Sequence, residues 1–258
     1  MIPKVIHQIW LGDSKAIPED QKRYMKDCRA LFEKEGYLYR LWDMENFLAE
    51  FPSSPYFEAT CAAKKYGFAS DYIRLKVLER YGGIYLDTDV KVLKSLTPFL
   101  KDKAFFGYIL DDSIGTAVIG MEKDCPLADV LLKRIEEVYR EKKIFPVSND
   151  VVTSYFMDDP DFLLDGKEFV TKEGYHFCPR YYFEKNTAWY RHYEGGYTRH
   201  YPAGSWHKEH PLRDAVQKVA RFLLGEAFVA DLYNLLQRGK NFSYPRFKQD
   251  RKRRKKTR

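Results

Sequence analysis

Two aspartates, Asp87 and Asp89, stand two residues apart directly after the short apolar run 84–86. Such a run predicts a buried strand, so the two carboxylates lie on the turn that leaves it. Carboxylate oxygens at the C-terminal edge of a sheet suit a hard divalent cation, which can bind both phosphates of a diphosphate. A bare D-x-D also arises by chance as a solvated turn. The neighbouring residues therefore decide between the two interpretations.

The segment before this strand predicts a helix over residues 64–81, which Gly82-Gly83 ends because glycine accepts the left-handed conformation at a helix C-terminus. Asp71 and Arg74 are three residues apart and share one face of that helix. One interpretation is an exposed ion pair worth roughly a few tenths of a kcal/mol. The other is a binding pair, in which Asp71 accepts hydrogen bonds from ribose or sugar hydroxyls and Arg74 donates to sugar or phosphate oxygens.

The chain resembles the D-x-D sugar transferases of glycosyltransferase family 32, through four motifs in the same order: Trp10-Leu11-Gly12, Ala69-Ser70-Asp71-x-x-Arg74, Gly82-Gly83-Ile84-Tyr85-Leu86-Asp87-x-Asp89 and Gly204-Ser205-Trp206. These transferases include bacterial capsule-synthesis enzymes and yeast mannosyltransferases, and they are similar in fold to the clostridial glucosylating toxins. The resemblance covers residues 2 to about 207. It implies an α/β chain of the GT-A fold, with helices flanking a mixed central sheet.

The resemblance further implies a metal-dependent hexosyltransferase that retains the anomeric configuration. Its implied donor is a nucleotide-sugar, most simply a UDP-sugar, and its cofactor is Mn²⁺ or Mg²⁺. GDP-mannose stays open as an alternative donor. The implied acceptor is a glycan or a lipid-linked oligosaccharide, extended toward a bacterial capsule or surface polysaccharide.

Residue by residue, the resemblance assigns donor contacts. Trp10 matches the tryptophan that stacks on the donor base, and Asp71 with Arg74 matches the pair that holds ribose and sugar hydroxyls. Tyr85 matches a contact to the ribose, and Ser205-Trp206 matches a closing-loop pair that reaches the metal and the β-phosphate.

The resemblance also assigns metal contacts. Asp87 matches a residue at the metal-bound water, and Asp89 matches the direct metal ligand. The third protein ligand is open among His200, Ser205 and His207, and the predicted metal set is Asp87, Asp89 and His200. The predicted catalytic set is Asp71, Arg74, Asp87 and Asp89. Hard oxygen ligands suit Mg²⁺ or Mn²⁺, whereas zinc would favour Cys/His clusters of a kind that the sequence lacks.

Residues 1–207 are predicted to form the catalytic domain and residues 208–258 a C-terminal extension. Strands are expected at 2–11, 37–42, 84–86, 90–93, 104–110 and 116–121, and helices at 18–34, 64–81, 127–142 and 149–160. A loop containing Pro52 and Pro55 is expected to lead to the 64–81 helix. The aromatic stretch 175–201 is expected to be irregular, either packed in the core and on the surface or lining an acceptor wall.

Three further features have less to do with catalysis. His7 follows a strand pattern and is expected to be a hydrogen-bonded core histidine. Asp111 and Asp112 are read as a solvated loop or as part of the acceptor side. Asn149-Asp150 is read as a helix N-cap with an acid in the first turn.

The charge is concentrated at the C-terminus. Residues 248–258 hold eight of the 44 basic and one of the 37 acidic residues, so the rest of the chain is neutral. With an amphipathic helix expected over 212–237, this basic tail favours attraction to an anionic membrane. Nucleic acid is disfavoured because the tail has no interleaved aromatics. No apolar run is long enough to span a bilayer and the four cysteines are scattered, so we expect a cytoplasmic protein, peripheral at the inner face of the cell membrane.

Two other classes remain as alternatives. A phosphatase of the haloacid dehalogenase type also uses D-x-D after a strand, but it usually has Thr or Val where this chain has Lys91. A non-enzymatic binding protein, tethered to membrane or nucleic acid, is the other. Metal-dependent donor hydrolysis separates an enzyme from the latter.

Overall fold

The computed structural model describes residues 1–184, 196–201, 219, 224 and 240–256. The predicted donor residues Ser205 and Trp206, the alternative ligand His207 and almost all of the predicted 212–237 helix lie outside these ranges. So does the predicted domain boundary after residue 207, which stays a prediction.

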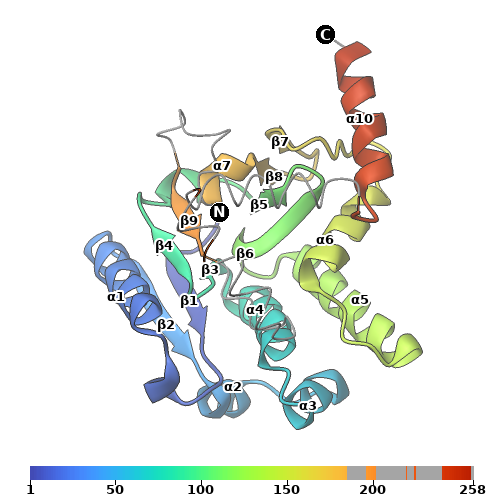
Figure 1. Cartoon of the computed structure of the whole chain (residues 1–258). Helices are drawn as coiled ribbons and strands as arrows, with labels where there is room; N and C mark the ends of the chain where they lie inside the picture. Colours follow the sequence, from blue (N-terminus) through green and yellow to red (C-terminus); the bar gives the residue numbers. More distant parts are fainter. Residues whose placement is uncertain (185–195, 202–218, 220–223, 225–239, 257–258) are drawn as a thin grey trace.

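A mixed seven-stranded sheet forms the centre of the molecule (Figure 1). Its strands lie in the order β2-β1-β3-β6-β5-β8-β7. Their bounds are β1 Val5–Ile9, β2 Leu38–Trp42, β3 Gly83–Leu86, β5 Ala104–Leu110, β6 Ser113–Met121, β7 Phe169–Val170 and β8 Tyr175–Cys178. Strand β1 is parallel to β2 and β3, and β6 is antiparallel to β3 and β5. The predicted mixed α/β architecture is therefore confirmed.

Helices cover both faces of the sheet. They are α1 Glu19–Lys34, α2 Met44–Glu50, α3 Pro55–Ala62, α4 Tyr66–Tyr81, α5 Pro126–Lys142, α6 Ser148–Met157 and the short α7 Arg180–Phe183, with 3-10 turns η1 Ser14–Ala16 and η2 Thr97–Phe99. Successive strand residues point to opposite faces. Accordingly, Tyr85 packs with α2 to α6, whereas Ile84 and Leu86 pack in a second cluster with α1, η2 and α7.

The expected loop around Pro52 and Pro55 is wrong, because α2 and α3 fill it. Asp43 and Asn46 form a reciprocal capping box at the start of α2. Pro55 occupies the first turn of α3, where its missing N–H costs no hydrogen bond. The prolines therefore separate two short helices and do not exclude them.

The aromatic stretch 175–201 is more regular than expected. It supplies β8, α7 and a last strand, β9 Thr198–His200, which pairs antiparallel with β4 Val90–Val92 in a separate two-stranded sheet. Strand β4 follows the D-x-D turn directly. The chain thus returns from a distant part of the sequence to lie beside Asp89.

The C-terminal basic segment, which the sequence analysis describes only as a basic tail, belongs to a helix, α10 Tyr244–Lys256. Its inner face is docked, with Phe247 and Asp250 buried. Asp250 accepts a hydrogen bond from the backbone N–H of Leu164 at 3.1 Å, and Arg246 donates to the backbone oxygen of Met157 at 2.9 Å. The basic residues therefore project from a fixed support.

The tight turn between β5 and β6 anchors the start of this helix. Asp112 is buried, its carboxylate accepts from the Asn241 amide at 3.0 Å, and its backbone oxygen accepts from the Ser243 hydroxyl. The solvated-loop interpretation of Asp112 is therefore wrong. In the described part of the chain, no helix combines the length and apolar character that crossing a membrane requires.

Candidate active site

Two glycines bring helix α4 beside the D-x-D strand. Gly82 and Gly83 have φ values of +61° and +99°, in the region that L side chains rarely adopt. A Cβ on Gly83 would also lie 2.6 Å from the backbone oxygen of Val5. Because no side chain intervenes, β3 can lie against β1 directly after α4 ends. The α4 face that carries Asp71 and Arg74 therefore lies next to the end of β3.

Arg74 forms the centre of the donor-side cluster. Its guanidinium lies 2.8 Å from Asp71 Oδ1 and 3.2 Å from Asp87 Oδ1, and it donates to the backbone oxygen of Thr116 at 2.6 Å. It also lies 4.5 Å from the centre of the Tyr85 ring. The Arg74 side chain is only 6% exposed, so the surface ion-pair interpretation is wrong. Arg74 connects α4, β3 and β6 through one planar group.

Asp87 is fixed from several directions. The Tyr85 hydroxyl donates to its carboxylate, and Gln8 Nε2 donates to its backbone oxygen at 3.3 Å. Burial raises the pKa of Asp87 to about 6 although the Arg74 charge acts in the opposite direction. Arg74 does not fully offset the cost of burying the ionised Asp87 carboxylate. A second positive charge nearby would therefore stabilise the ionised form further.

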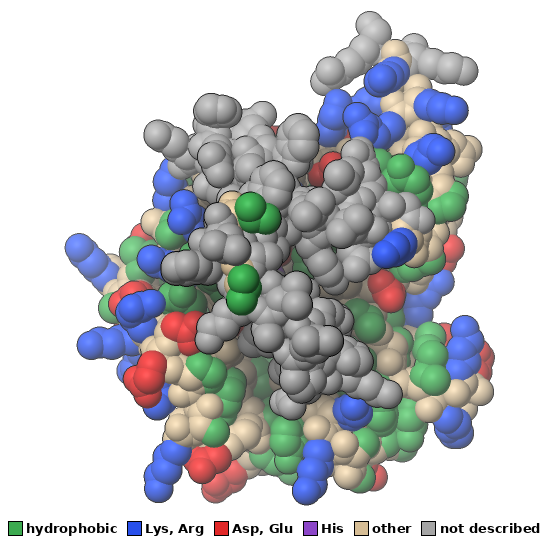
Figure 2. Space-filling view, viewed as in Figure 1, with side chains coloured by type: hydrophobic (Ala, Val, Ile, Leu, Met, Phe, Trp, Pro, Cys, Tyr) green, Lys and Arg blue, Asp and Glu red, His purple; other side chains and the backbone are tan. Residues whose placement is uncertain are grey.

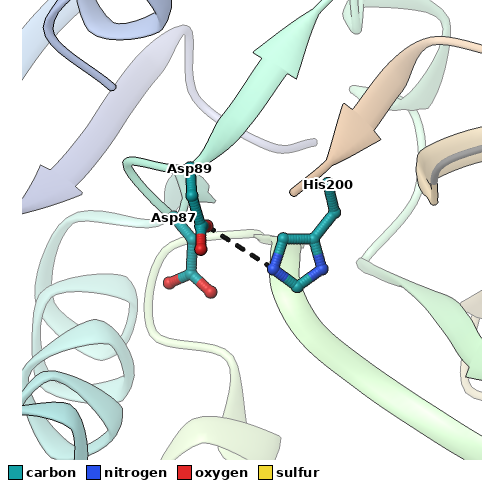
Figure 3. Close-up of side chains that lie close together, drawn as sticks. All are labelled: Asp87, Asp89 and His200. Carbon is teal, nitrogen blue, oxygen red and sulfur yellow. Dashed lines mark ion pairs between the residues drawn. The ribbon is translucent and has the colours of Figure 1, made fainter. Parts of the chain in front are cut away.

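Asp89 and His200 come together through the small sheet. The β4–β9 register places Val90 opposite His200, and Tyr201 donates its backbone N–H to the backbone oxygen of Asp89 at 3.0 Å. His200 Nε2 lies 3.5 Å from Asp89 Oδ1. The dashed line in Figure 3 marks this ion pair. One ligand atom from each of Asp87, Asp89 and His200 lies within 4.8 Å of the others. The structure therefore gathers the three residues of the predicted metal set.

Glu184 is a site residue that the sequence reasoning missed. Its carboxylate lies 3.2 Å from His200 Nδ1, on the side of the ring away from Asp89. Burial by itself lowers the pKa of His200, but Glu184 and Asp89 outweigh it and hold that pKa well above its usual value. A carboxylate on one ring nitrogen orients the other toward a metal. The only sequence signal was one acid at the end of the aromatic run 181–183.

The donor set of this cluster fits a divalent cation. Two carboxylates suit Mg²⁺ and Mn²⁺ equally, whereas an imidazole ligand is rarer for Mg²⁺, which prefers oxygen ligands and water.

The start of helix α6 completes the Arg74 side of the site. Ser148 hydrogen-bonds to the carboxylate of Asp71, which thus stands at a helix N-terminus, where negative charge is favourable. The hydroxyl of Thr116 lies 2.8 Å from Ser148 Oγ and from Asn149 Oδ1. The N-cap interpretation of Asn149 is wrong, because α6 already begins at Ser148. Thr116 was not singled out from the sequence.

Trp10 and His7 lie on the same strand in different environments. Trp10 directly follows β1 and is half-buried, and its indole N–H donates to the backbone oxygen of Asp13 at 3.0 Å. His7 is fully buried, accepts from the Trp42 indole at 3.0 Å and meets the backbone oxygen of Gly82 at 2.9 Å. The prediction of a hydrogen-bonded core histidine is confirmed.

Comparison with known proteins agrees with this geometry. Residues 18–106 match the family model described as "Glycosyltransferase sugar-binding region containing DXD motif". The matched region contains the α4 pair Asp71 and Arg74 and both aspartates of the D-x-D.

Two curated relatives are similar over most of the chain. An uncharacterized glycosyltransferase of Acanthamoeba polyphaga mimivirus is 31% identical over 165 residues, covering 61% of this chain and 64% of the relative. Inositol phosphoceramide mannosyltransferase 3 of Schizosaccharomyces pombe is 29% identical over 217 residues, covering 80% of this chain and 56% of the relative. The chain thus spans less than two thirds of the length of these relatives.

A solved glycosyltransferase, described as involved in glycosylation of the major capsid of PBCV-1, superposes with a TM-score of 0.50. The superposition covers 78% of this chain and 95% of that one, at 15% sequence identity, and it supports the GT-A fold. Together these matches confirm the predicted resemblance to D-x-D glycosyltransferases.

Proposed function

We propose that this chain, which carries the D-x-D sugar-binding region of glycosyltransferases, is a metal-dependent transferase that moves a hexose from a nucleotide-sugar to a glycan or lipid-linked acceptor. The observation that carries the proposal is the convergence of Asp87, Asp89 and His200 beside the buried Arg74 at the end of β3. A cation-binding set next to a fixed guanidinium is suited to a diphosphate leaving group.

Asp87, Asp89 and His200 would hold the metal, and Glu184 would orient His200. When bound, a divalent ion acts as a Lewis acid on the phosphate oxygens that gain negative charge as the nucleoside diphosphate departs. Arg74 adds a fixed positive charge next to Asp87, at 3.2 Å from its carboxylate. Because the fold holds the Arg74 guanidinium in place, this charge needs no rearrangement as the reaction proceeds.

The remaining donor contacts follow from the positions of the side chains. Asp71 presents a carboxylate at the N-terminus of α6, where ribose and sugar hydroxyls can donate to it. Trp10 lies directly after the C-terminal end of β1, where its indole would stack on the base. Base–aromatic stacking contributes about 1–3 kcal/mol in comparable contacts. Ser205 and Trp206 complete the proposed donor site from the closing loop.

We propose a front-face transfer that retains the anomeric configuration. A double displacement needs a carboxylate free to attack the anomeric carbon. Among the described site residues, Asp71 is paired with Arg74, and Asp87 and Asp89 belong to the metal set. The side chains that contact the sugar hydroxyls would then hold the sugar so that the acceptor attacks the same face that the diphosphate leaves.

The donor is proposed to be a UDP-sugar, with mannose as a second candidate sugar because several curated relatives are named mannosyltransferases. The names of those relatives include ceramides, which supports a lipid-linked acceptor here. We further propose a peripheral, cytoplasmic location at the inner face of the cell membrane, with a role in capsule or surface polysaccharide synthesis. The exposed basic residues of α10 support contact with anionic lipid.

A panel of nucleotide-sugars scored for hydrolysis and transfer tests the proposal. Wild-type protein should be active with Mn²⁺ and inactive in EDTA, and Asp89→Ala should be inactive with every donor. Asp161→Ala serves as the control, because Asp161 is an exposed aspartate paired with Lys172 away from the site. Turnover in EDTA, or wild-type turnover by Asp89→Ala, would refute the metal-dependent mechanism.

A further inference from the structure

A basic cavity of about 150 Å³ lies between helix α10 and the turn 165–167. It is lined by Asp165, Lys167, Arg251, Arg254 and Lys255. Figure 2 shows Lys and Arg side chains gathered over α10. The cavity is separate from the D-x-D cluster and shares no residue with it.

The cavity is built from fixed parts. The Asp165 carboxylate is 1% exposed and lies 2.6 Å from Arg254 Nε, and it also accepts from the backbone N–H of Lys167 at 3.2 Å. Gly166 has φ +74°, and a Cβ there would lie 2.9 Å from the Asp111 Cβ, so the turn packs tightly on the β5–β6 connection. One wall is therefore held in position.

The other wall is held by the docking of α10. The buried Asp250 bonds the Leu164 backbone, one residue before Asp165, and pairs with Arg246 at 2.7 Å. One face of α10 is thus fixed against the connection between α6 and β7, and the lining residues Arg251 and Lys255 come one and five residues after Asp250 on the same helix. Both are exposed at the cavity mouth.

The charge of the cavity selects its ligand. Four cationic side chains and one carboxylate line it, and the carboxylate is engaged with Arg254. The excess positive charge favours a compact polyanion, and guanidinium and ammonium donors match phosphate oxygens. The volume is several times the roughly 30 Å³ that one water occupies, enough for a phosphate group.

We propose that this cavity binds the phosphate of a phospholipid headgroup, and that α10 contacts the membrane through this specific site as well as through diffuse charge. The inference rests on the proposed membrane contact and is independent of the transfer reaction. A phosphomonoester headgroup such as that of phosphatidic acid presents the most charge on the smallest group, so it should fit best.

The position of α10 relates the cavity to the D-x-D site. Thr116 on β6 accepts from Arg74, and Asp112, just before the same strand, holds Asn241 ahead of α10. Thr116 lies four residues after Asp112, a rise of about 13 Å along the strand. A membrane held at α10 would therefore lie at the end of the sheet where β6 borders the D-x-D turn, which suits an acceptor presented by a lipid.

Vesicle binding by matched double variants tests this inference. Arg251→Gln/Lys255→Gln removes two charges that line the cavity, and Lys248→Gln/Lys252→Gln removes two exposed charges of α10 that do not line it. Substitution is preferable to truncation, because removing residues 248–258 would also remove the buried Asp250. Circular dichroism and melting temperature verify that both variants are folded.

Binding is measured on phosphatidylcholine vesicles doped with phosphatidic acid or with phosphatidylserine at matched surface charge. We expect wild-type protein and the control variant to prefer phosphatidic acid, and the lining variant to lose about tenfold in affinity for it, a change equal to 1.4 kcal/mol. Equal losses of vesicle affinity in both variants, without a lipid preference, would refute the cavity as a lipid-phosphate site. Such a result would still agree with diffuse electrostatic attraction to the membrane. Absence of binding to any anionic vesicle would refute the membrane proposal as well.

Inorganic phosphate separates a lipid ligand from a free one. Because the lipid phosphate and the free ion compete for the same donors, millimolar phosphate should displace wild-type protein from phosphatidic acid vesicles at constant ionic strength. A melting-temperature shift with inorganic phosphate in the control but not in the lining variant, combined with no vesicle binding, would refute the lipid source.

Discussion

Replacing Arg74 by methionine should destabilise the protein far more than an equivalent change at an exposed arginine. Methionine keeps much of the side-chain volume but leaves Asp71 and Asp87 without the guanidinium that lies 2.8 and 3.2 Å from them. Breaking a buried ion pair from one side costs about 3–5 kcal/mol. The backbone oxygen of Thr116 also loses its donor. We therefore expect the free energy of unfolding to fall by about 4 kcal/mol.

Arg134→Met is the control, because Arg134 pairs with Asp158 at the surface, where such pairs contribute about 0–1 kcal/mol. Both variants are unfolded with urea in EDTA and followed by circular dichroism. At roughly 2–4 °C per kcal/mol for a chain of this size, Arg74→Met should melt about 10 °C below wild type. The control should melt within a few degrees of wild type.

The pH dependence of the stability deficit tests whether the unpaired buried carboxylates cause it. Without Arg74, Asp71 and Asp87 can avoid the cost of burial by taking up protons, so the deficit of Arg74→Met should shrink between pH 7 and pH 5. The deficit shrinks toward low pH, and not toward high pH, because the pKa of Asp87 is already raised to about 6 in the folded state. Mn²⁺ should also restore part of the lost stability. A deficit equal to that of Arg134→Met, or one independent of pH, would refute the reasoning.

Four further outcomes test other parts of the structure. Mn²⁺ at 100 times its dissociation constant should stabilise wild type by about 2.7 kcal/mol but should not stabilise Asp89→Asn. Asp102→Asn is the control and should be stabilised like wild type, because Asp102 contacts His176 in a carboxylate–histidine cluster elsewhere. Equal melting shifts in all three proteins would contradict the metal assignment. Trp10→Ala should raise the donor KM more than it lowers kcat, because stacking is similar in ground and transition states; unchanged nucleotide affinity by calorimetry would make Trp10 purely structural. Burial lowers the pKa of His7 to about 4. As pH falls from 6.5 to 4, the free energy of unfolding of wild type should therefore fall by about 3 kcal/mol relative to that of His7→Gln. Parallel pH profiles of the two proteins would argue against this. Asp250→Asn should cost about 1–3 kcal/mol in urea unfolding, and an unchanged midpoint would mean that α10 is not anchored through this carboxylate.

The elements that carry the site could be predicted because their signals are local. The run 64–81 is rich in helix formers. Gly82 and Gly83, which follow it, mark the end of the helix at the observed residue, Tyr81. Strand β3 and the D-x-D turn follow from a short apolar run before two acids. The partners Asp71 and Arg74 follow from a spacing of three on that helix.

The other half of the site depends on long-range contacts that no local pattern encodes. His200 was a candidate among several, and only the pairing of β9 with β4 places it at Asp89. Glu184 and Thr116 contribute through tertiary contacts to His200 and Arg74. The basic C-terminus looked like a solvated tail because its composition masks Phe247 and Asp250, which turn inward only once a helix forms.

The small β4–β9 sheet has a consequence for the order of assembly. His200 follows Asp89 by 111 residues in the sequence, so it can join Asp87 and Asp89 only after that whole stretch has been made. Contacts of such high sequence separation form late, because the chain loses loop entropy before it gains them. A nascent or truncated chain that ends before β9 would therefore carry the D-x-D without its histidine. At the proposed metal site, tight affinity would therefore arise only once β9 has paired with β4.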